Sequence, residues 1–480
     1  MSPASRVRQN SFFSLISSAI RLSSSFLLFV GIARLYGPEA FGQYTTAHAL
    51  STLFLILADL GLDTLLALEV ARQQESAAAV LRRYAAIKVT VAVAASLTMV
   101  GIGALQPLPD GTSLLIVILG ASVVFSALMN FEFALLRGVE QLHHEAGITA
   151  FINAAALVLL ILAGLVHAPL SVVALIYALT RVAGYLLARR RTRRVLGVSR
   201  IGLTFEGWAA VRGKAALFAA YLLFGYLVFQ LDTLLLAALR GPADVGTYQA
   251  VFKVVVVALV IPDVVASATL PTLSRLHRES PEEWLRLGGR LGRWLLLASL
   301  PVALVMVAYP GAILAILYGA DTFPEAVPIM RIFGGVVFIR FAAETFGLLL
   351  TTSEHQHLRV WVLGVATAVN AAANLALIPG QGPRGAAVIS LATNAGIAAA
   401  YVLMIRRRYR PAGPDARLVI TALATAAIAA VSLAVPPAST WVALPVAVGT
   451  SLLVAYFVGL REDERATLFA FATKFREGQR

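Results

Sequence analysis

The segment Arg34-Leu-Tyr-Gly-Pro-Glu-Ala-Phe-Gly-Gln-Tyr44 contains a Gly-Pro break, and it returns in shorter form as Arg240-Gly-Pro-Ala-Asp-Val-Gly-Thr-Tyr248. An apolar run follows each copy and ends at an aspartate. The matching positions are all 204 residues apart: Gly37/Gly241, Pro38/Pro242, Gly42/Gly246, Tyr44/Tyr248 and Asp59/Asp263. Because Gly-Pro does not continue a helix, each copy predicts a short turn between two helices. The chain is therefore predicted to consist of two related halves.

The composition is that of a membrane protein. Of the 480 residues, 59% are hydrophobic and 13% are charged, which is more apolar surface than a water-soluble core could cover. The chain has no cysteine, so a disulfide framework, a thiolate metal site and a cysteine nucleophile are excluded. The formal net charge of +14 raises the alternative of nucleic-acid binding, which the placement of the charges can test.

Fourteen apolar runs approach the roughly 20 residues that a helix needs to cross a bilayer. They lie near residues 12–33, 43–66, 84–105, 113–135, 147–166, 170–188, 215–239, 247–271, 291–314, 328–351, 358–378, 384–405, 418–435 and 441–459. The first run has the basic start of a signal peptide, but Arg21 interrupts it and no convincing cleavage site follows. The sequence thus predicts an all-α integral membrane fold of about 14 transmembrane helices.

Basic residues alternate from loop to loop along the chain. With the N-terminus in the cytoplasm, most of the 39 Lys and Arg residues fall on the inner side, and the outer loops keep only Arg34, Arg240 and Arg384. This asymmetry satisfies the positive-inside rule and predicts cytoplasmic N- and C-termini. Because the charge is spread over every inner loop and forms no single patch, it argues against a nucleic-acid partner.

The longest basic segment separates the two copies of the repeat. We predict an N-terminal lobe of six helices at residues 1–190, a basic cytoplasmic linker at 191–214 and a second six-helix lobe at 215–405. Two further helices at 406–460 and a cytoplasmic tail at 461–480 follow. Six helices separate the copies, so the lobes enter the membrane in the same direction and are predicted to be related by an axis along the membrane normal.

The opening of the chain carries motifs that extend beyond the repeat. They are Gly-Ile-Ala-Arg-Leu-Tyr-Gly-Pro-Glu-Ala-Phe-Gly-Gln-Tyr at 31–44, Ala-Asp-Leu-Gly-Leu at 58–62 and Glu-Val-Ala-Arg at 69–72. Together they resemble the Wzx-type oligosaccharide and polysaccharide flippases. These form a branch of the multidrug/oligosaccharidyl-lipid/polysaccharide exporter superfamily, which also contains the lipid II flippase and the MATE multidrug antiporters. The resemblance covers the chain through its plan of six, six and two helices.

The resemblance implies a transporter and not an enzyme. The implied fold has two pseudo-symmetric lobes around a central cavity that opens alternately to either side of the membrane. The implied cargo is an oligosaccharide on undecaprenyl diphosphate, and the implied place is the bacterial cytoplasmic membrane. Membrane lipids, a polysaccharide polymerase and chain-length regulators are the other partners it implies. The sequence does not select among O-antigen, capsule and exopolysaccharide pathways.

Three basic residues inside apolar runs are candidates for the wall of such a cavity, because charge at membrane depth is expensive and marks function. Arg21 lies roughly 13 Å into the first run, Lys253 a few residues into the eighth, and Arg340 near the middle of the tenth. In the lipid II flippase, basic residues of the first and eighth helices line the cavity, and Arg21 and Lys253 occupy comparable helices. The alternative is a pair with a neighbouring carboxylate, or snorkelling of Lys253 to the interface.

Four carboxylates are candidates for ion coupling or gating. Glu344 follows Arg340 by four residues, so the two share a helix face, either as a structural pair or as a coupling or substrate site. Asp232 has no acidic counterpart 204 residues earlier, and the resemblance to MATE proteins makes it a candidate site for Na⁺ or H⁺. Asp59 and Asp263 lie near the inner ends of their helices, where we expect them to hold linker arginines at a gate. The membrane potential is a further candidate driving force.

Two other functions fit parts of this pattern. A MATE-type cation-coupled multidrug antiporter has the same architecture, but basic residues at membrane depth favour an anionic cargo over a cationic drug. A membrane glycosyltransferase, polymerase or ligase would be an enzyme with sizeable outer loops, whereas the longest outer loop here runs from about 315 to 327. The sequence contains no recognisable phosphate-binding loop, metal-ligand cluster or nucleophile, so neither a cofactor nor a metal is predicted.

Overall fold

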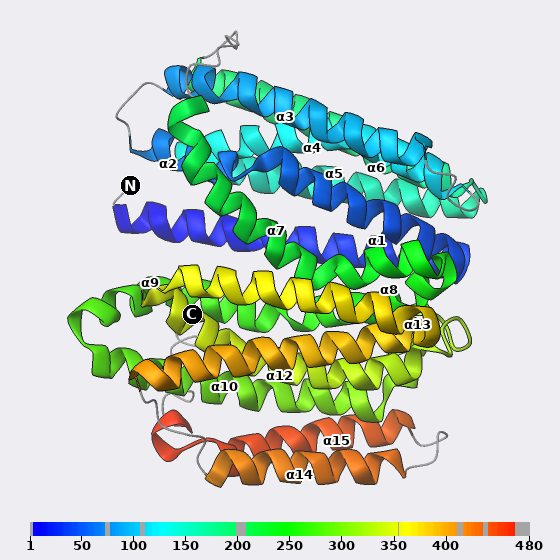
Figure 1. Ribbon diagram of the computed structural model, residues 1–480, viewed down its shortest axis with the longest axis vertical. Coiled ribbons are helices and arrows are strands. Elements are labelled where there is room, and N and C mark those ends of the chain that lie inside the picture. Colours follow the sequence, from blue (N-terminus) through cyan, green and yellow to red (C-terminus); the bar gives the residue numbers. More distant parts are fainter. Residues whose placement is uncertain are drawn as a thin grey trace, which may run out of the picture. The chain divides into compact units, whose positions relative to one another are not determined.

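The computed structural model describes residues 3–72, 77–105, 111–197, 208–353, 355–409, 416–434 and 440–465. In these ranges every regular element is a helix (Figure 1). The helices are α1 (Pro3–Asp59), α2 (Leu62–Ala71), α3 (Ala77–Leu105), α4 (Thr112–Gly138), α5 (Leu142–Leu165), α6 (Leu170–Leu196), α7 (Trp208–Leu239), α8 (Pro242–Ala258), α9 (Val260–Glu279), α10 (Pro281–Ala308), α11 (Pro310–Tyr318), α12 (Ala326–Thr352), α13 (Gln356–Tyr409), α14 (Ala416–Leu433), α15 (Thr440–Val454) and the π-helical turn η2 (Ala455–Gly459). The predicted all-α fold class is confirmed.

Twelve helical segments of the described residues are long and apolar enough to cross a membrane. Two of these segments are broken by a glycine in a left-handed conformation: Gly37 in α1, with a φ of 82°, and Gly382 in α13, with a φ of 56°. Each broken helix covers two of the apolar runs found in the sequence. The predicted number of about 14 crossings stays a prediction, because it depends on counting both arms of each broken helix.

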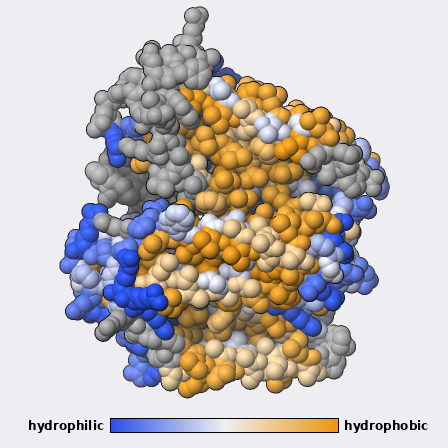
Figure 2. Space-filling model, viewed as in Figure 1, coloured by the Kyte–Doolittle hydropathy of each residue, from blue (hydrophilic) through white to orange (hydrophobic). Residues whose placement is uncertain are grey.

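Apolar side chains follow the length of the helices in each part of the molecule, and polar side chains gather at the helix ends (Figure 2). Large apolar residues with high exposure include Phe151 and Leu162 on α5, Trp361 on α13 and Leu423 on α14. Apolar surface on this scale is unfavourable in water and favourable in a bilayer. The surface therefore agrees with a protein that spans a membrane many times.

Both copies of the Gly-Pro repeat form the predicted turn. Gly37 and Gly241 have φ values of 82° and 134°, a region that only glycine enters without strain. In the second copy α8 begins at Pro242, where the fixed φ of proline suits the first helical position and no backbone N–H is lost. The Gly-Pro order thus follows from the geometry of the turn.

The two copies of the repeat also touch each other. A β-carbon on Gly42 would overlap the carbonyl oxygen of Pro242, and one on Gly246 would overlap the carbonyl oxygen of Pro38. The contact is reciprocal, because each copy offers its proline carbonyl to the glycine of the other. These two glycines are therefore required by close backbone packing and not by their own dihedral angles.

The chain divides into two compact units, residues 1–249 (unit 1) and residues 250–480 (unit 2). In unit 1, α4 packs against α3 and α6, and α1 packs against α5. In unit 2, α12 packs against α10 and α13, and α14 packs against α10. The division falls inside α8, and the lobe boundaries at residues 190, 214 and 405 stay predictions.

Some helices extend beyond the ends of their apolar runs, because polar residues continue the helix. α6 runs on to Leu196 through basic residues of the predicted linker and ends at Gly197, which has a φ of 66°. α10 starts ten residues before its apolar run and ends at Ala308, because Pro310 lacks the N–H that would continue the helix. Residues 198–207 of the predicted linker and 466–480 of the predicted tail lie outside the described residues.

Candidate functional site

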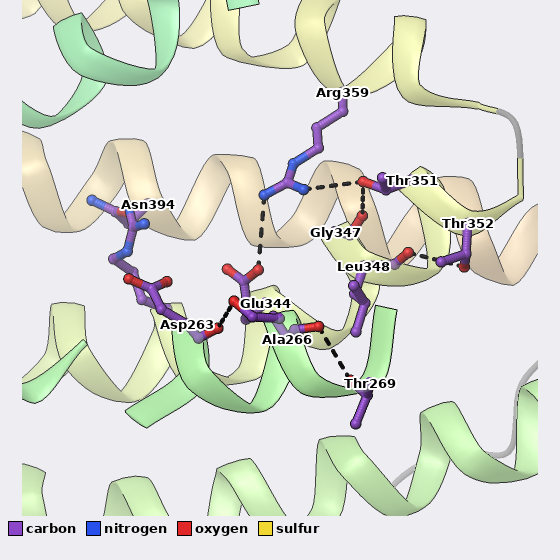
Figure 3. A network of polar contacts seen from close by, with 12 residues as sticks. Asp263, Ala266, Thr269, Glu344, Gly347, Leu348, Thr351, Thr352, Arg359 and Asn394 are labelled. Carbon is purple, nitrogen blue, oxygen red and sulfur yellow. Dashed lines mark hydrogen bonds and ion pairs between the residues drawn. The ribbon is translucent and has the colours of Figure 1, made fainter. Parts of the chain in front are cut away.

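A network of charged side chains connects α9, α12 and α13 in unit 2 (Figure 3). Glu344 of α12 forms an ion pair with Arg359 of α13, with Oε1 and Nη2 3.9 Å apart. Arg359 Nη1 also donates to Thr351 Oγ1 at 3.1 Å. A β-carbon on Gly347 would lie 3.4 Å from the guanidinium carbon, so this glycine leaves room for the arginine beside α12. Asp263 of α9 lies close enough to Glu344 and Arg359 for electrostatic interaction with both.

Arg340 belongs to the same network. Its side chain is half-buried, and Nη1 donates to Asn394 Oδ1 of α13 at 3.3 Å. Glu344 and Asp263 are both near enough to attract its guanidinium. The structure therefore brings together three of the residues selected from the sequence, Asp263, Arg340 and Glu344. Their part in substrate binding or ion coupling stays a prediction.

The other two predicted cavity residues have different surroundings. Arg21 is exposed on α1, and its Nη2 reaches Ser18 Oγ at 3.4 Å, one turn earlier on the same helix. An exposed guanidinium at this depth is tolerated where it faces water or head groups, and is costly where it faces lipid chains. Lys253 is half-buried on α8 in unit 2. Whether the two side chains line one cavity stays a prediction.

Asp59 belongs to a charge cluster in unit 1 that surrounds a buried lysine. Lys88 of α3 is fully buried, and its Nζ lies 2.8 Å from Asp59 Oδ1 and 2.8 Å from Asp63 Oδ1. Lys88 is thus a partner of Asp59 that the sequence analysis did not name, and the expected contact between Asp59 and an arginine of the linker stays a prediction. Lys88 stands at the start of the third apolar run, where the sequence suggests an inner-loop charge. The fold instead turns it inward, because two carboxylates compensate the buried ammonium.

Asp232 of α7 is almost completely buried and accepts a hydrogen bond from the Tyr248 hydroxyl at 2.6 Å. The neighbouring Gln249 donates from Nε2 to Thr233 Oγ1 at 2.6 Å and to Gln230 Oε1 at 3.1 Å. The second copy of the repeat therefore anchors α8 to α7 through two successive polar side chains. A buried carboxylate that accepts a short hydrogen bond suits either a structural anchor or a proton site.

The sequence matches a family model described as polysaccharide biosynthesis protein over residues 7–277. The chain belongs to this family. The match covers both copies of the Gly-Pro repeat and ends close to the end of α9. The resemblance stated from the motifs at residues 31–72 is thereby confirmed at the level of the family. No curated protein sequence matches the chain significantly.

The fold of this polysaccharide biosynthesis protein is similar to those of solved transporters of the multidrug/oligosaccharidyl-lipid/polysaccharide (MOP) superfamily. The lipid II flippase MurJ in an inward closed conformation has a TM-score of 0.74 at 10% identity, over 92% of this chain and 97% of that chain. A multidrug resistance MATE family transporter in its inward-facing conformation has a TM-score of 0.67 at 12% identity, over 82% and 97%. A MOP superfamily transporter from Pyrococcus furiosus, described as having a binding pocket of reverse polarity, has a TM-score of 0.57 at 12% identity, over 85% and 96%. Identities this low establish the fold alone.

This family member also contains charged residues within apolar runs that the sequence analysis did not select. Glu132 of α4 accepts a hydrogen bond from Arg189 of α6 at 3.1 Å, and both side chains are buried. Arg181 lies in the middle of the sixth apolar run. The signal was present in the sequence, because the rule that selects Arg21 applies equally to Glu132 and Arg181. Within the described ranges, no group of three or more His, Asp or Glu residues is placed to hold a metal ion.

Proposed function

We propose that this protein moves polyprenyl-diphosphate-linked oligosaccharides from the inner to the outer leaflet of the bacterial cytoplasmic membrane by alternating access. The observation that carries the proposal is the match to the polysaccharide biosynthesis protein family over residues 7–277 in a chain with the fold of MOP superfamily transporters. The basic residues Arg21, Lys253 and Arg340 within apolar helices support an anionic cargo.

The physical task of such a protein is to replace water around a charged head group. An unshielded diphosphate in hydrocarbon costs tens of kcal/mol, of the order of a Born solvation energy. Arginine and lysine side chains can replace part of that hydration, because they donate hydrogen bonds and carry the opposite charge. The lipid tail can remain in the bilayer throughout, and no covalent bond needs to be broken. The activity is therefore transport without catalysis.

The membrane potential gives this transport a direction. With the inside negative, a head group of net charge near −2 that moves outward gains about 4–5 kcal/mol per 100 mV. The same potential draws an empty, net-positive cavity toward the cytoplasmic side. In this mechanism the potential supplies part of the directionality of the cycle, and Na⁺ or H⁺ coupling through Asp232 or Glu344 is secondary. Asp59 and Asp263 contribute to gating at the inner ends of their helices.

The test is transfer of a fluorescent undecaprenyl-diphosphate oligosaccharide across the membrane of reconstituted vesicles under an imposed potential. We expect the wild-type protein to move the lipid and Arg21→Ala to reduce the rate by about tenfold or more, with Lys253→Ala also reduced. Arg331→Ala is the matched control, because Arg331 is exposed on α12 and has no assigned role. Folding of each variant is checked by gel filtration in detergent.

Two outcomes would contradict the proposal. An undiminished rate in vesicles without potential or ion gradient would remove the driving force proposed here. A wild-type protein that moves no polyprenyl diphosphate, but exports a cationic dye against a Na⁺ or H⁺ gradient, would replace the flippase with the MATE-type multidrug antiporter.

A further inference from the structure

Unit 1 contains a cluster of aromatic rings that the proposed function has not used. His48 stacks on Tyr44 with ring centroids 6.2 Å apart, and it meets Phe29 edge to face at 5.1 Å. It also meets Tyr177 of α6 edge to face at 5.8 Å. The rings of α1 and α6 thus form one continuous surface.

A guanidinium covers the α6 side of these rings. The Arg181 carbon Cζ lies 4.5 Å from the centroid of the Tyr177 ring, which is a cation–π contact. Arg181 Nη2 also reaches Asn153 Oδ1 of α5 at 3.3 Å. Tyr44 is close enough to interact electrostatically with both Tyr177 and Arg181. The aromatic cluster therefore carries one positive charge, held in place by stacking and by an amide.

Two hydrogen-bond donors of this cluster are buried without a partner among the described residues. They are the hydroxyl of Tyr44, a residue with no exposed surface, and Nε of Arg181. Buried donors of this kind are rare, since each costs about 1–3 kcal/mol when it is left unpaired. In a folded protein, such donors usually form a hydrogen bond with a ligand or a water molecule.

In the second copy of the repeat, the tyrosine hydroxyl that matches Tyr44 has a hydrogen-bond acceptor. Tyr248, the counterpart of Tyr44, donates its hydroxyl to Asp232. The position that matches Asp232 in the first copy is Leu28, which has no acceptor. The first copy thus has the tyrosine but lacks the carboxylate that would accept a hydrogen bond from its hydroxyl.

The chemistry of the two donors defines the ligand. Both donate, so the ligand must offer acceptor oxygens, and the guanidinium favours oxygens that carry negative charge. Arginine binds planar carboxylates and phosphates through neighbouring N–H groups, and Nε is one of those groups. His48, Tyr177 and Arg181 are half-buried, so the cluster reaches the surface of the packed helices. Aromatic side chains beside a few placed polar or charged groups are typical of small-molecule binding sites.

We propose that Arg181 and Tyr44, on the surface formed by Tyr177 and His48, bind an oxyanion of the transported head group. The oxyanion is either the carboxylate of an acidic sugar or a phosphate oxygen of the lipid carrier, because both present the same acceptors. The assignment to transported cargo rests on the proposed function, whereas the existence of the site does not.

The test measures anion binding to the purified full-length protein, without transport. Thermal unfolding is followed by the fluorescence of its five tryptophans in the presence of farnesyl diphosphate, galacturonate or neutral galactose. A ligand that binds the folded state raises the melting temperature with its concentration. We expect at least one anion to stabilise the wild type, with no response to galactose. Galacturonate alone would identify an acidic sugar, and farnesyl diphosphate alone would identify the carrier.

The variants separate binding from folding. Arg181→Gln and Tyr44→Phe should each raise the concentration needed for half of the anion effect by about tenfold. Tyr44→Phe should at the same time unfold at a higher temperature without anion, because it removes an unpaired buried hydroxyl. Tyr36→Phe is the matched control, since Tyr36 also has a buried hydroxyl without a partner in the described residues and lies outside the cluster. Arg331→Gln controls for loss of an exposed arginine.

Three results would overturn the site. These are no anion response in the wild type, an equal response to galactose, and an unchanged response in both Arg181→Gln and Tyr44→Phe. Transport is measured separately in vesicles. A protein that binds the anion through Arg181 but moves no lipid would keep this site and remove the flippase proposal. If the wild type moves the lipid, but Arg181→Gln and Tyr44→Phe bind the anion as the wild type does, the flippase proposal stands and this site is removed.

Discussion

Asp59 and Asp263 occupy matching positions in the repeat, yet their surroundings differ. Asp59 shares with Asp63 a fully buried lysine, at 2.8 Å from each carboxylate. Asp263 lies in a looser network, in which the ion pair between Glu344 and Arg359 measures 3.9 Å and both side chains are partly exposed. The first cluster is built on a fully buried lysine with short contacts, whereas in the second cluster Asp263 is exposed and the ion pair is longer.

The charged partners of the two aspartates have no charged counterpart at the matching position of the other copy. The residue 204 positions after Lys88 is Gly292, and the residue 204 positions before Arg359 is Ala155. The two halves therefore share the turn, the packing of the glycines and the aspartate, and differ in the charges that face it. We infer that unit 1 uses its cluster to fix α1, α2 and α3, whereas the network of unit 2 is better suited to change during transport.

The largest effect should come from the buried lysine. Lys88→Met leaves two half-buried carboxylates without their cation, and we expect it to lower the free energy of unfolding by about 3 kcal/mol, the lower end of the range for a buried pair. Arg359→Met should cost less, because its ion pair is longer and Arg359 is partly exposed, whereas Lys88 is fully buried. The measurement is reversible unfolding of both variants in mixed detergent micelles.

A double variant controls for the loss of lysine packing. Lys88→Met combined with Asp63→Asn removes one of the two uncompensated charges, so it should recover part of the lost stability. Equal costs for Lys88→Met and Arg359→Met would contradict the contrast between a cluster with a buried cation and a network with an exposed aspartate.

A smaller effect should come from the glycines where the two copies of the repeat touch. Gly42→Ala forces a β-carbon into the carbonyl oxygen of Pro242, and backbone cannot move aside as a flexible side chain does. We expect a loss of about 1–3 kcal/mol in the same unfolding assay. Gly246→Ala should behave alike, and the double variant should cost less than the two losses added, because one shift relieves both overlaps.

Gly147→Ala is the matched control for this pair. A β-carbon on Gly147 meets nothing within 4 Å, and the residue lies in the helix α5. Alanine should therefore stabilise by about 0.5–1 kcal/mol, through its better helix propensity. If Gly42→Ala is as harmless as Gly147→Ala, the reciprocal contact does not exist in the membrane.

Much of the fold could be predicted because its causes are local. The apolar runs fix where helices lie, and the Gly-Pro turn needs the positive φ that Gly37 and Gly241 adopt. The close approach at Gly42 could not be predicted. The sequence shows that this glycine is repeated, but not which backbone lies opposite.

The candidate site could be predicted less well, because hydropathy locates a helix in the bilayer without giving its rotation about its own axis. Successive side chains point about 100° apart, so one residue separates a buried position from a lipid-facing one. Lys88 and Arg359 lie near the starts of the third and eleventh apolar runs, where a charge is typical of a helix end, while the fold turns both toward carboxylates. Arg181 is different. It lay within an apolar run and could have been selected by the rule that selected Arg21.

The smallest effect in this comparison belongs to the tyrosine pair, and its sign matters more than its size. Tyr248→Phe removes the hydrogen bond to buried Asp232 and should cost about 1–2 kcal/mol in the unfolding assay. Tyr44→Phe should do the opposite, since its hydroxyl is buried with no partner among the described residues. If the two substitutions change the free energy of unfolding in opposite directions, the ring packs in both halves, but the hydroxyl stabilises the fold only in the second half. Equal losses would mean that Tyr44 has an acceptor in the folded protein, and the oxyanion site of unit 1 would then already be filled.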